Sequence, residues 1–188
     1  PASWPDAILT AATAAGSTVK LGTGTDIYDD IMGEDGVLAL VEEDGFGVDG
    51  HVAALTMKAK LRGLRATDGT PIFVTNMQGK TPYALDGEQM FFSRNGSFDV
   101  TEALMISGNF KQAVYAVRQD MTYKVLDQAV ITDADGKIIY NLAQQDMVAL
   151  RVVTRLGWAL PQPANRLGAT TPYPFAALLP ASATPSEA

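Results

Sequence analysis

The chain has 188 residues, 47% of them hydrophobic, which is enough for one domain, or one domain of two lobes, with a buried core. It carries 14 basic and 21 acidic residues, a net charge of −7, and no basic run, so the charge pattern of a direct nucleic-acid binder is missing. The absence of cysteine excludes disulfides and thiolate sites and is typical of a cytosolic protein. No apolar run approaches the ~20 residues of a membrane span, so we expect no membrane partner. Because the sequence begins at Pro1 rather than Met, we expect a fragment or processed product.

The N-terminal part predicts helices joined by turns. Ser3 is placed to cap a helix over residues 7–15, with Pro and Asp in its first turn. A loop over residues 21–25 follows, and Thr25 is placed to cap a second helical stretch that reaches Glu43, weakened in its middle by glycines.

Two features of this part have a chemical and a structural interpretation. Gly22 and Gly24 could cradle a phosphate, but the third glycine and preceding strand of a dinucleotide fingerprint are absent, which favours a plain loop. Five acidic residues follow, and they could hold a cation: Asp26, Asp29, Asp30, Glu34 and Asp35. A solvated acidic helix face is the favoured interpretation, since no calcium-type loop accompanies them.

The middle of the chain alternates short apolar runs with turns. We predict strands at 52–55, 72–74 and 103–106, a helix over 57–65 capped by Thr56, and hairpin-like turns between 76 and 108. His51 is the only histidine, and without a nearby nucleophile or metal-ligand partner we interpret it as structural rather than catalytic.

The following part is predicted to be all strand. Apolar runs at 113–117 and 121–125 predict two strands, and residues 130–140 predict a hairpin that turns at Asp133–Gly136. Asp133 and Asp135 suggest a calcium loop, but the third acid and the closing Glu are missing, so a metal-free turn is favoured.

The longest pattern covers residues 147–160 and predicts one nearly continuous strand. Its even positions are apolar apart from Thr154, and the odd positions include Arg151 and Arg155, which is the period of a strand with one buried face. We therefore expect five side chains to be buried, opposite the arginines: Val148, Leu150, Val152, Leu156 and Trp158. After Leu160 the composition shifts to proline and alanine, which predicts an extended tail whose residues 173–179 lie on the body.

Helices first and strands later, without regular alternation, indicate an α+β fold. No catalytic, cofactor or metal constellation assembles from the sequence, so we expect no enzyme.

Three segments resemble a known family. Ser107–Arg118, the run Asp146–Ala159 with its two arginines, and the helix–strand–helix pattern of Asp26–Gly69 are similar to segments of the major capsid proteins of tailed bacteriophages, which have the HK97-like capsid fold. The family usually has Gly-Asp-Phe where this chain has Gly108–Phe110. The resemblance covers roughly Pro1 to Leu179.

The resemblance implies a prophage or phage head protein that self-assembles into pentamers and hexamers of an icosahedral shell in the bacterial cytoplasm. Packaged DNA would be an indirect partner, and a scaffold or protease could act during assembly. It further implies one capsid-type domain of two lobes. The peripheral-lobe part would comprise 1–21 and about 119–147, the axial lobe about 22–118 and 148–179, and a flexible tail 180–188.

The same resemblance implies that an N-terminal arm, an extended loop and most of a spine helix precede Pro1. We therefore expect residues 1–188 alone not to close shells. Some members cross-link a Lys of that loop to an Asn, and Asp146 stands at the corresponding position, where a carboxylate cannot release ammonia.

Three alternatives remain at this point. An encapsulin-type nanocompartment shell would share the fold and package protein cargo. A metal-dependent α+β hydrolase would use Asp133, Asp135 or the acids of 26–35. A monomeric binding module is the third.

Overall fold

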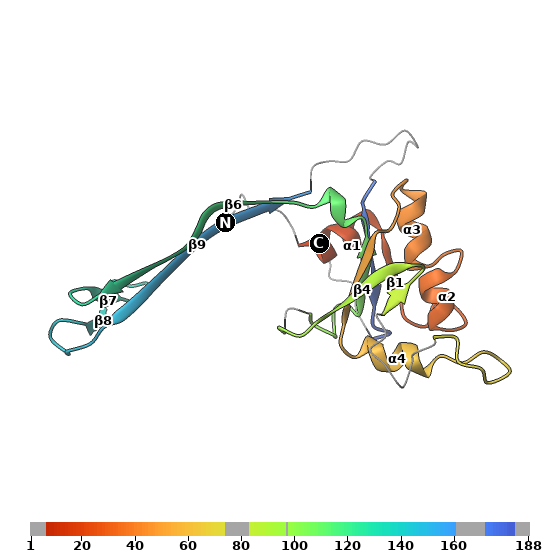
Figure 1. The fold of residues 1–188 in the computed structure, drawn as a ribbon, viewed down its shortest axis with the longest axis horizontal. Helices are drawn as coiled ribbons and strands as arrows, with labels where there is room; N and C mark the ends of the chain where they lie inside the picture. Colours follow the sequence, from red (N-terminus) through yellow and green to blue (C-terminus); the bar gives the residue numbers. More distant parts are fainter. Residues whose placement is uncertain (1–6, 74–82, 97, 161–171, 183–188) are drawn as a thin grey trace. The chain divides into compact units, whose positions relative to one another are not determined.

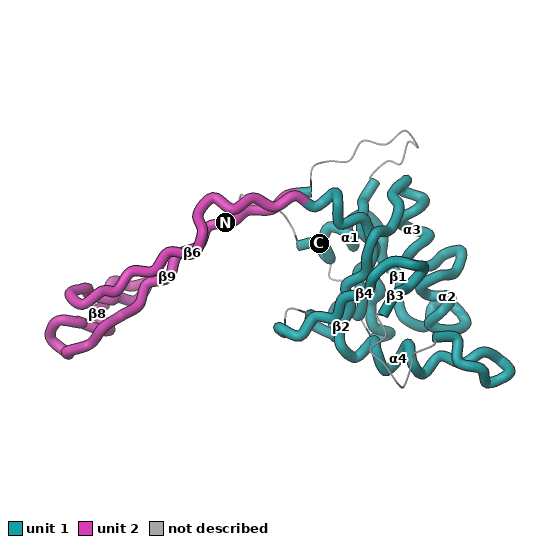
Figure 2. Tube along the Cα trace, viewed as in Figure 1, with its two compact units in different colours: residues 1–113, 160–188 teal, residues 114–159 magenta. Residues whose placement is uncertain are grey.

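The computed structural model describes residues 7–73, 83–96, 98–160 and 172–182, and these form two compact units (Figures 1 and 2). Unit 1 contains the described residues up to Ala113 and from Leu160 onward, and unit 2 is Val114–Ala159. Helices and sheet are mixed in unit 1, whereas the described elements of unit 2 are strands. The α+β expectation is confirmed.

Unit 1 is built on a mixed sheet of six described strands in the order β1-β10-β5-β2-β4-β3 (Figure 1). The strands are β1 (Thr18–Lys20), β2 (Gly50–Ala54), β3 (Ala84–Leu85), β4 (Glu88–Ser93), β5 (Met105–Gly108) and β10 (Phe175–Leu179). β1 pairs with β10 and β2 with β4 in parallel, and the other pairs are antiparallel. Strands distant in sequence therefore meet in one sheet.

The helices of unit 1 cover both faces of this sheet. They are α1 (Ile8–Ala15), α2 (Ile27–Met32), α3 (Val37–Glu43), α4 (Met57–Gly63) and the 3-10 helix η1 (Phe110–Gln112). Successive side chains of a strand point to opposite faces. Ala176 and Leu178 accordingly join the main core with α2, α3 and α4, while Ala177 and Leu179 join a second cluster with Leu9 of α1.

The helix boundaries have local causes. α1 ends at Gly16, whose left-handed φ of 82° closes the helix, as the sequence predicts. The N-cap of α2 is Asp26 and not Thr25, because the Asp26 carboxylate accepts the amide hydrogens of Tyr28 and Asp29. The expected start at Ser3 lies outside the described residues.

Gly36 divides the second helical stretch into α2 and α3. A Cβ at this position would lie 2.8 Å from the Ile31 carbonyl oxygen, so the tight turn between the two helices requires glycine. Residues 72 and 73, expected in a strand, form a bend instead, and Val74 lies outside the described residues. β1 was not predicted, since three residues give too short a pattern.

The expected proline-rich tail contains a core strand. β10 lies between β1 and β5, and all five of its side chains are buried, so the expectation that residues 175–179 merely lie on the body is wrong. A strand that is buried on both faces has no alternation of polar and apolar residues, and this removes the usual sequence signal.

Unit 2 is a long antiparallel ribbon with a smaller hairpin. β6 (Val114–Leu126) pairs with β9 (Ala149–Ala159), and β7 (Val130–Thr132) pairs with β8 (Ile138–Asn141). The two strands predicted at 113–117 and 121–125 are one strand, which contains two bulges between Val117 and Thr122. Each bulge adds one residue to β6. Two extra residues return the odd-numbered side chains of β6 to the same face on both sides of the bulges.

The predicted strand over 147–160 is confirmed as β9, but the burial predicted for its apolar face is wrong. Leu150 is 62% exposed and Val148 is 68% exposed, Val152 and Leu156 are also exposed, and Trp158 is only half-buried. The alternation predicts one apolar face correctly, but no described segment of unit 2 covers that face.

The boundaries of the units differ from the expected lobes. Residues 148–159 were expected to accompany 22–118, but β9 pairs along its whole length with β6, and the two strands form unit 2. The assignment of the units to lobes stays a prediction. Residues 183–188 of the expected tail lie outside the described residues.

Candidate assembly surfaces

His51 forms a buried hydrogen-bonded pair with Ser107. Its Nε2–H donates to the Leu85 carbonyl oxygen at 3.1 Å, so Nδ1 accepts the Ser107 hydroxyl at 2.8 Å. Burial lowers the pKa of His51 and outweighs the hydrogen bond to Leu85, which raises it. Both side chains have 0% exposure, so a substrate cannot reach them in this structure. The sequence did not indicate Ser107 as a partner of His51, and the structural role of His51 stays a prediction.

The Gly22–Gly24 loop binds a carboxylate of its own chain. The amide hydrogens of Gly22 and Gly24 donate to the two oxygens of buried Asp30, each at 2.7 Å. These amides are the groups that a phosphate would need. The loop is therefore held in place by Asp30, so one of the predicted cluster acids has a structural role and does not lie on a solvated face.

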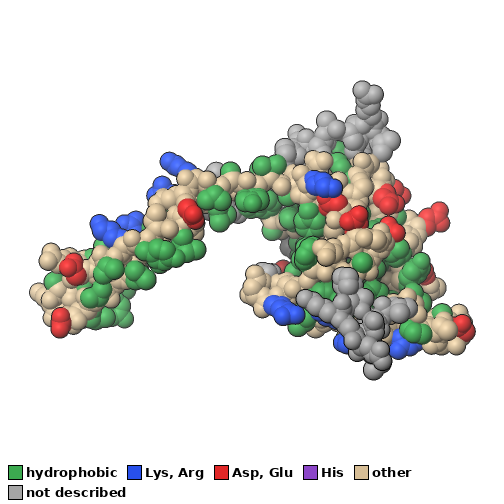
Figure 3. All heavy atoms as spheres, viewed as in Figure 1, with side chains coloured by type: hydrophobic (Ala, Val, Ile, Leu, Met, Phe, Trp, Pro, Cys, Tyr) green, Lys and Arg blue, Asp and Glu red, His purple; other side chains and the backbone are tan. Residues whose placement is uncertain are grey.

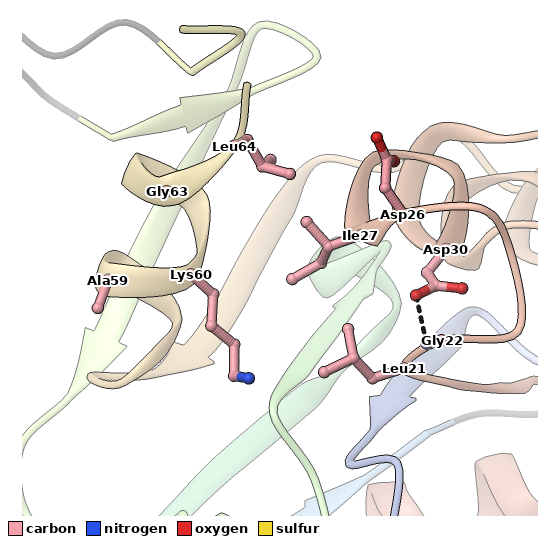
Figure 4. Close-up of a pocket in the computed structure, with 9 residues that line it drawn as sticks. All are labelled: Leu21, Gly22, Asp26, Ile27, Asp30, Ala59, Lys60, Gly63 and Leu64. Atoms are coloured by element: carbon pink, nitrogen blue, oxygen red, sulfur yellow. Dashed lines mark hydrogen bonds between the residues drawn. The ribbon is translucent and has the colours of Figure 1, made fainter. Parts of the chain in front are cut away.

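A pocket near these residues lies between this loop, α2 and α4, with a volume of about 410 Å³ (Figure 4). Its apolar lining includes Leu21, Ile27 and Leu64, and the side chain of Lys60 in α4 also lines it. Its nine lining residues include no His, Ser or Cys. The carboxylates among its described lining residues are Asp26, which caps α2, and Asp30, which binds the loop.

Asp133 and Asp135 lie in the predicted tight turn. The Asp133 carboxylate accepts the amide hydrogens of Asp135 and Lys137, and Gly136 has a left-handed φ of 80°. The turn prediction is confirmed. Within the described ranges no group of three or more His, Asp or Glu side chains could hold a metal ion.

The segment Gly108–Phe110 joins the core of unit 1 to unit 2. A Cβ on Gly108 would lie 2.2 Å from the Pro174 carbonyl oxygen, so only glycine fits there. Phe110 packs edge-on against Phe175, with ring centroids 5.1 Å apart. Asp49 accepts the Phe110 amide hydrogen at 2.7 Å. These contacts explain why the sequence pattern of this segment is distinctive.

The β6–β9 ribbon has one apolar face. Directly paired residues of antiparallel strands share a face, and four such pairs are apolar: Tyr115–Trp158, Val117–Leu156, Tyr123–Val152 and Val125–Leu150. Tyr115 is 78% exposed. Hydrophobic side chains run along one side of unit 2 (Figure 3). We call this surface the apolar face.

The opposite face of the ribbon is cationic. Lys124 pairs directly with Arg151, and Arg155 lies two pairs further along the same face. The three cations line a shallow hollow of about 200 Å³ together with Gln119, Thr122 and Val153. Lys and Arg side chains are visible along the side of unit 2 opposite the hydrophobic ones (Figure 3). We call Lys124, Arg151 and Arg155 the cationic strip.

Comparison with known proteins identifies the family. Residues 3–165 match the phage capsid family, a family of structural proteins, so the chain belongs to it. No curated protein matches the chain.

Solved phage structures share its fold, which is HK97-like. A chain from Microbacterium phage Oxtober96 is 34% identical with a TM-score of 0.80, and the match covers 96% of this chain and 57% of that one. A chain from Mycobacterium phage Cain is 30% identical with a TM-score of 0.78, covering 98% and 57%. One from Mycobacterium phage Adephagia is 31% identical with a TM-score of 0.76, covering 98% and 58%. The chain thus spans a little over half the length of the structures it matches.

None of the described helices is long and apolar enough to cross a membrane. Asp146, at the expected cross-link position, is exposed and has a left-handed φ of 52°.

Proposed function

We propose that the chain is the C-terminal part of a structural subunit of a phage head, which self-assembles into pentamers and hexamers. The observation that carries the proposal is the apolar face of unit 2, because a two-stranded ribbon with one uncovered apolar face is marginal in water. Family membership and the similarity to phage structures support it.

The magnitude of the uncovered surface supports an assembly role. Full burial of a large apolar side chain contributes about 1.5–3 kcal/mol, and the seven exposed members of the apolar pairs are each about half to three-quarters exposed. Covering them would contribute on the order of 10 kcal/mol before the costs of association. A contiguous uncovered apolar surface of this kind favours a protein partner.

We further propose that unit 1 contains the axial lobe and unit 2 part of the peripheral lobe. The subunit assembles in the bacterial cytoplasm, is not an enzyme, and meets packaged DNA only indirectly; a scaffold or protease acts during assembly. The hydrolase alternative is less favoured, since three of its candidate acids, Asp133, Asp26 and Asp30, bind backbone amides. Among the described residues, its acids form no group that could hold a metal ion.

Electron microscopy of the purified protein that contains these residues tests the proposal. Closed shells or five- and six-membered rings are the expected result. Shells that contain a single protein cargo instead of DNA would favour the encapsulin-type alternative. A stable monomer at all concentrations, or an isolated two-fold dimer, would contradict the proposal, because capsomer contacts are head-to-tail around a ring axis.

A further inference from the structure

The charges of the chain are distributed unevenly between its units. Five basic and five acidic residues lie in Val114–Ala159, so the remaining 9 basic and 16 acidic residues give the rest of the chain the whole net charge of −7. The cationic strip therefore stands out as a local positive surface in an acidic protein.

The cationic strip is electrostatically unfavourable in the isolated chain. Lys124 and Arg151 occupy directly opposite positions on one face, and like charges at such positions destabilise a strand pair. Lys124, Arg151 and Arg155 are exposed, and none forms an ion pair or side-chain hydrogen bond within the part that the structure describes. An anionic partner would relieve this repulsion.

A matching anionic surface lies on unit 1. We call it the acidic rim, and it consists of Glu34 and Asp35 just before α3 and Glu42 and Glu43 in its last turn. All four side chains are exposed, and no cation pairs with them among the described residues. Acidic side chains gather over α3 in Figure 3.

The acidic rim is unfavourable for the same kind of reason. The C-terminal end of a helix carries partial negative charge, which disfavours the carboxylates of Glu42 and Glu43, and α3 has no basic residue in its last turn. Each surface thus lowers the stability of the isolated chain, and each has the charge that the other lacks.

We propose that the cationic strip of one copy binds the acidic rim of a neighbouring copy. The proposal rests on self-assembly as the proposed function and names the surfaces of one contact. A contact between two different surfaces is head-to-tail, which is the arrangement that produces rings. The apolar face, on the other side of the same ribbon, remains available for a separate contact.

Charge-reversal variants that are mixed with each other test this contact. One variant carries Lys124→Glu and Arg151→Glu, which makes both of its surfaces acidic. The other carries Glu34→Lys, Glu42→Lys and Glu43→Lys, which leaves Asp35 as the only acid of the rim and makes both of its surfaces basic. The control carries Lys137→Glu and Glu102→Lys, exposed residues outside both surfaces. The variants are made in the protein that forms rings or shells.

Each reversal variant alone should associate at least about tenfold more weakly than wild type, because like charges then face each other. An equimolar mixture should recover association as even-numbered rings, in which the two variants alternate. The control should behave as wild type. The readouts are particle mass by mass photometry and thermal unfolding, the latter to confirm that each variant is folded.

Other outcomes separate the possibilities. If the wild type forms particles and both variants assemble equally well, the proposed contact is overturned but the proposed function is not. If the wild type does not assemble, the proposed function itself is overturned. Weak variants that the mixture does not rescue would contradict contact between copies. Normal assembly with reduced retention of DNA by the strip variant would assign the strip to nucleic acid. Wild-type association should also weaken between about 0.1 and 1 M salt.

Discussion

Gly108 is the position at which one added methyl group should be most damaging. In the structure its Cβ would stand 2.2 Å from the Pro174 carbonyl oxygen, 2.5 Å from Phe175 Cδ1 and 2.8 Å from Phe175 Cα. The first distance falls about 1 Å short of ordinary van der Waals contact. Two of these atoms are backbone, so no rotamer change can relieve the contact, and β5 and β10 must separate.

The expected cost of Gly108→Ala combines two effects. Overpacking of a core costs about 1–3 kcal/mol, and the Asn109 amide hydrogen bond to Pro174, 2.9 Å long, contributes about 1 kcal/mol that would be weakened. The sum is roughly 2–4 kcal/mol, and for a chain of this size it corresponds to a fall in Tm of roughly 10 °C.

Hydrogen exchange of the β5 and β10 amides is the appropriate assay, because units 1 and 2 need not unfold together. Gly63→Ala is the matched control: it lies in the same unit, a Cβ there meets nothing within 4 Å, and alanine in helix α4 should stabilise by about 0.5–1 kcal/mol. If the β10 amides exchange as slowly in Gly108→Ala as in the control, the close packing around Gly108 is incorrect.

Three further predictions concern pH, assembly and covalent chemistry. Burial lowers the pKa of His51 in the folded state, so neutral His51 contributes fully to stability above the unfolded pKa of about 6.5, and this contribution is lost as the pH falls below that value. The Tm of the wild type should therefore drop more between pH 7 and pH 5 than the Tm of His51→Gln. Equal drops in the two proteins would refute this. Leu150→Asp should lower the free energy of unfolding of the isolated chain by less than about 1 kcal/mol, because Leu150 is exposed, yet weaken assembly; loss of the folded monomer would contradict this exposure. Particles should dissolve to monomers in boiling SDS, because the Asp146 carboxylate cannot release ammonia as asparagine does, and covalent ladders mapped to Asp146 would refute this.

Elements determined by neighbouring residues could be predicted from the sequence. The stop of α1 at Gly16 and the turn at Asp133–Gly136 each depend on a few adjacent residues, and both are found. The alternation of residues 147–160 likewise predicts strand β9 and its two faces. Sequence patterns of this kind report local backbone geometry, which is why they succeed.

Features that depend on distant partners could not be predicted. The local sequence of β10 predicts an extended tail, because the position of this strand between β1 and β5 depends on residues far away in the chain. The apolar alternation of β9 shows which side chains share a face but not what covers them, and so burial was wrongly expected for Leu150.

The candidate surfaces were partly visible in the sequence. Arg151 and Arg155 were placed together opposite the apolar face, and the structure confirms this. Lys124 joins them only through the cross-strand register, which the two bulges of β6 hide. The role of Asp30 was also missed, because a carboxylate that binds glycine amides six and eight residues earlier has no repeating pattern.

The pairing of β1 with β10 delays completion of the unit 1 sheet until late in synthesis of the chain. Residues 18–20 can pair only after residues 175–179 have been synthesised. At ~5–20 residues per second the ribosome needs roughly 10–30 s to synthesise the intervening chain. Until then β1 lacks its β10 partner, and the edge of β5 that β10 will fill stays unpaired from the time β5 is made. A chain cut short between Ala159 and Phe175 cannot complete this sheet, although its β6–β9 ribbon has already been made. Completion of the unit 1 sheet therefore depends on synthesis of the chain through residues 175–179.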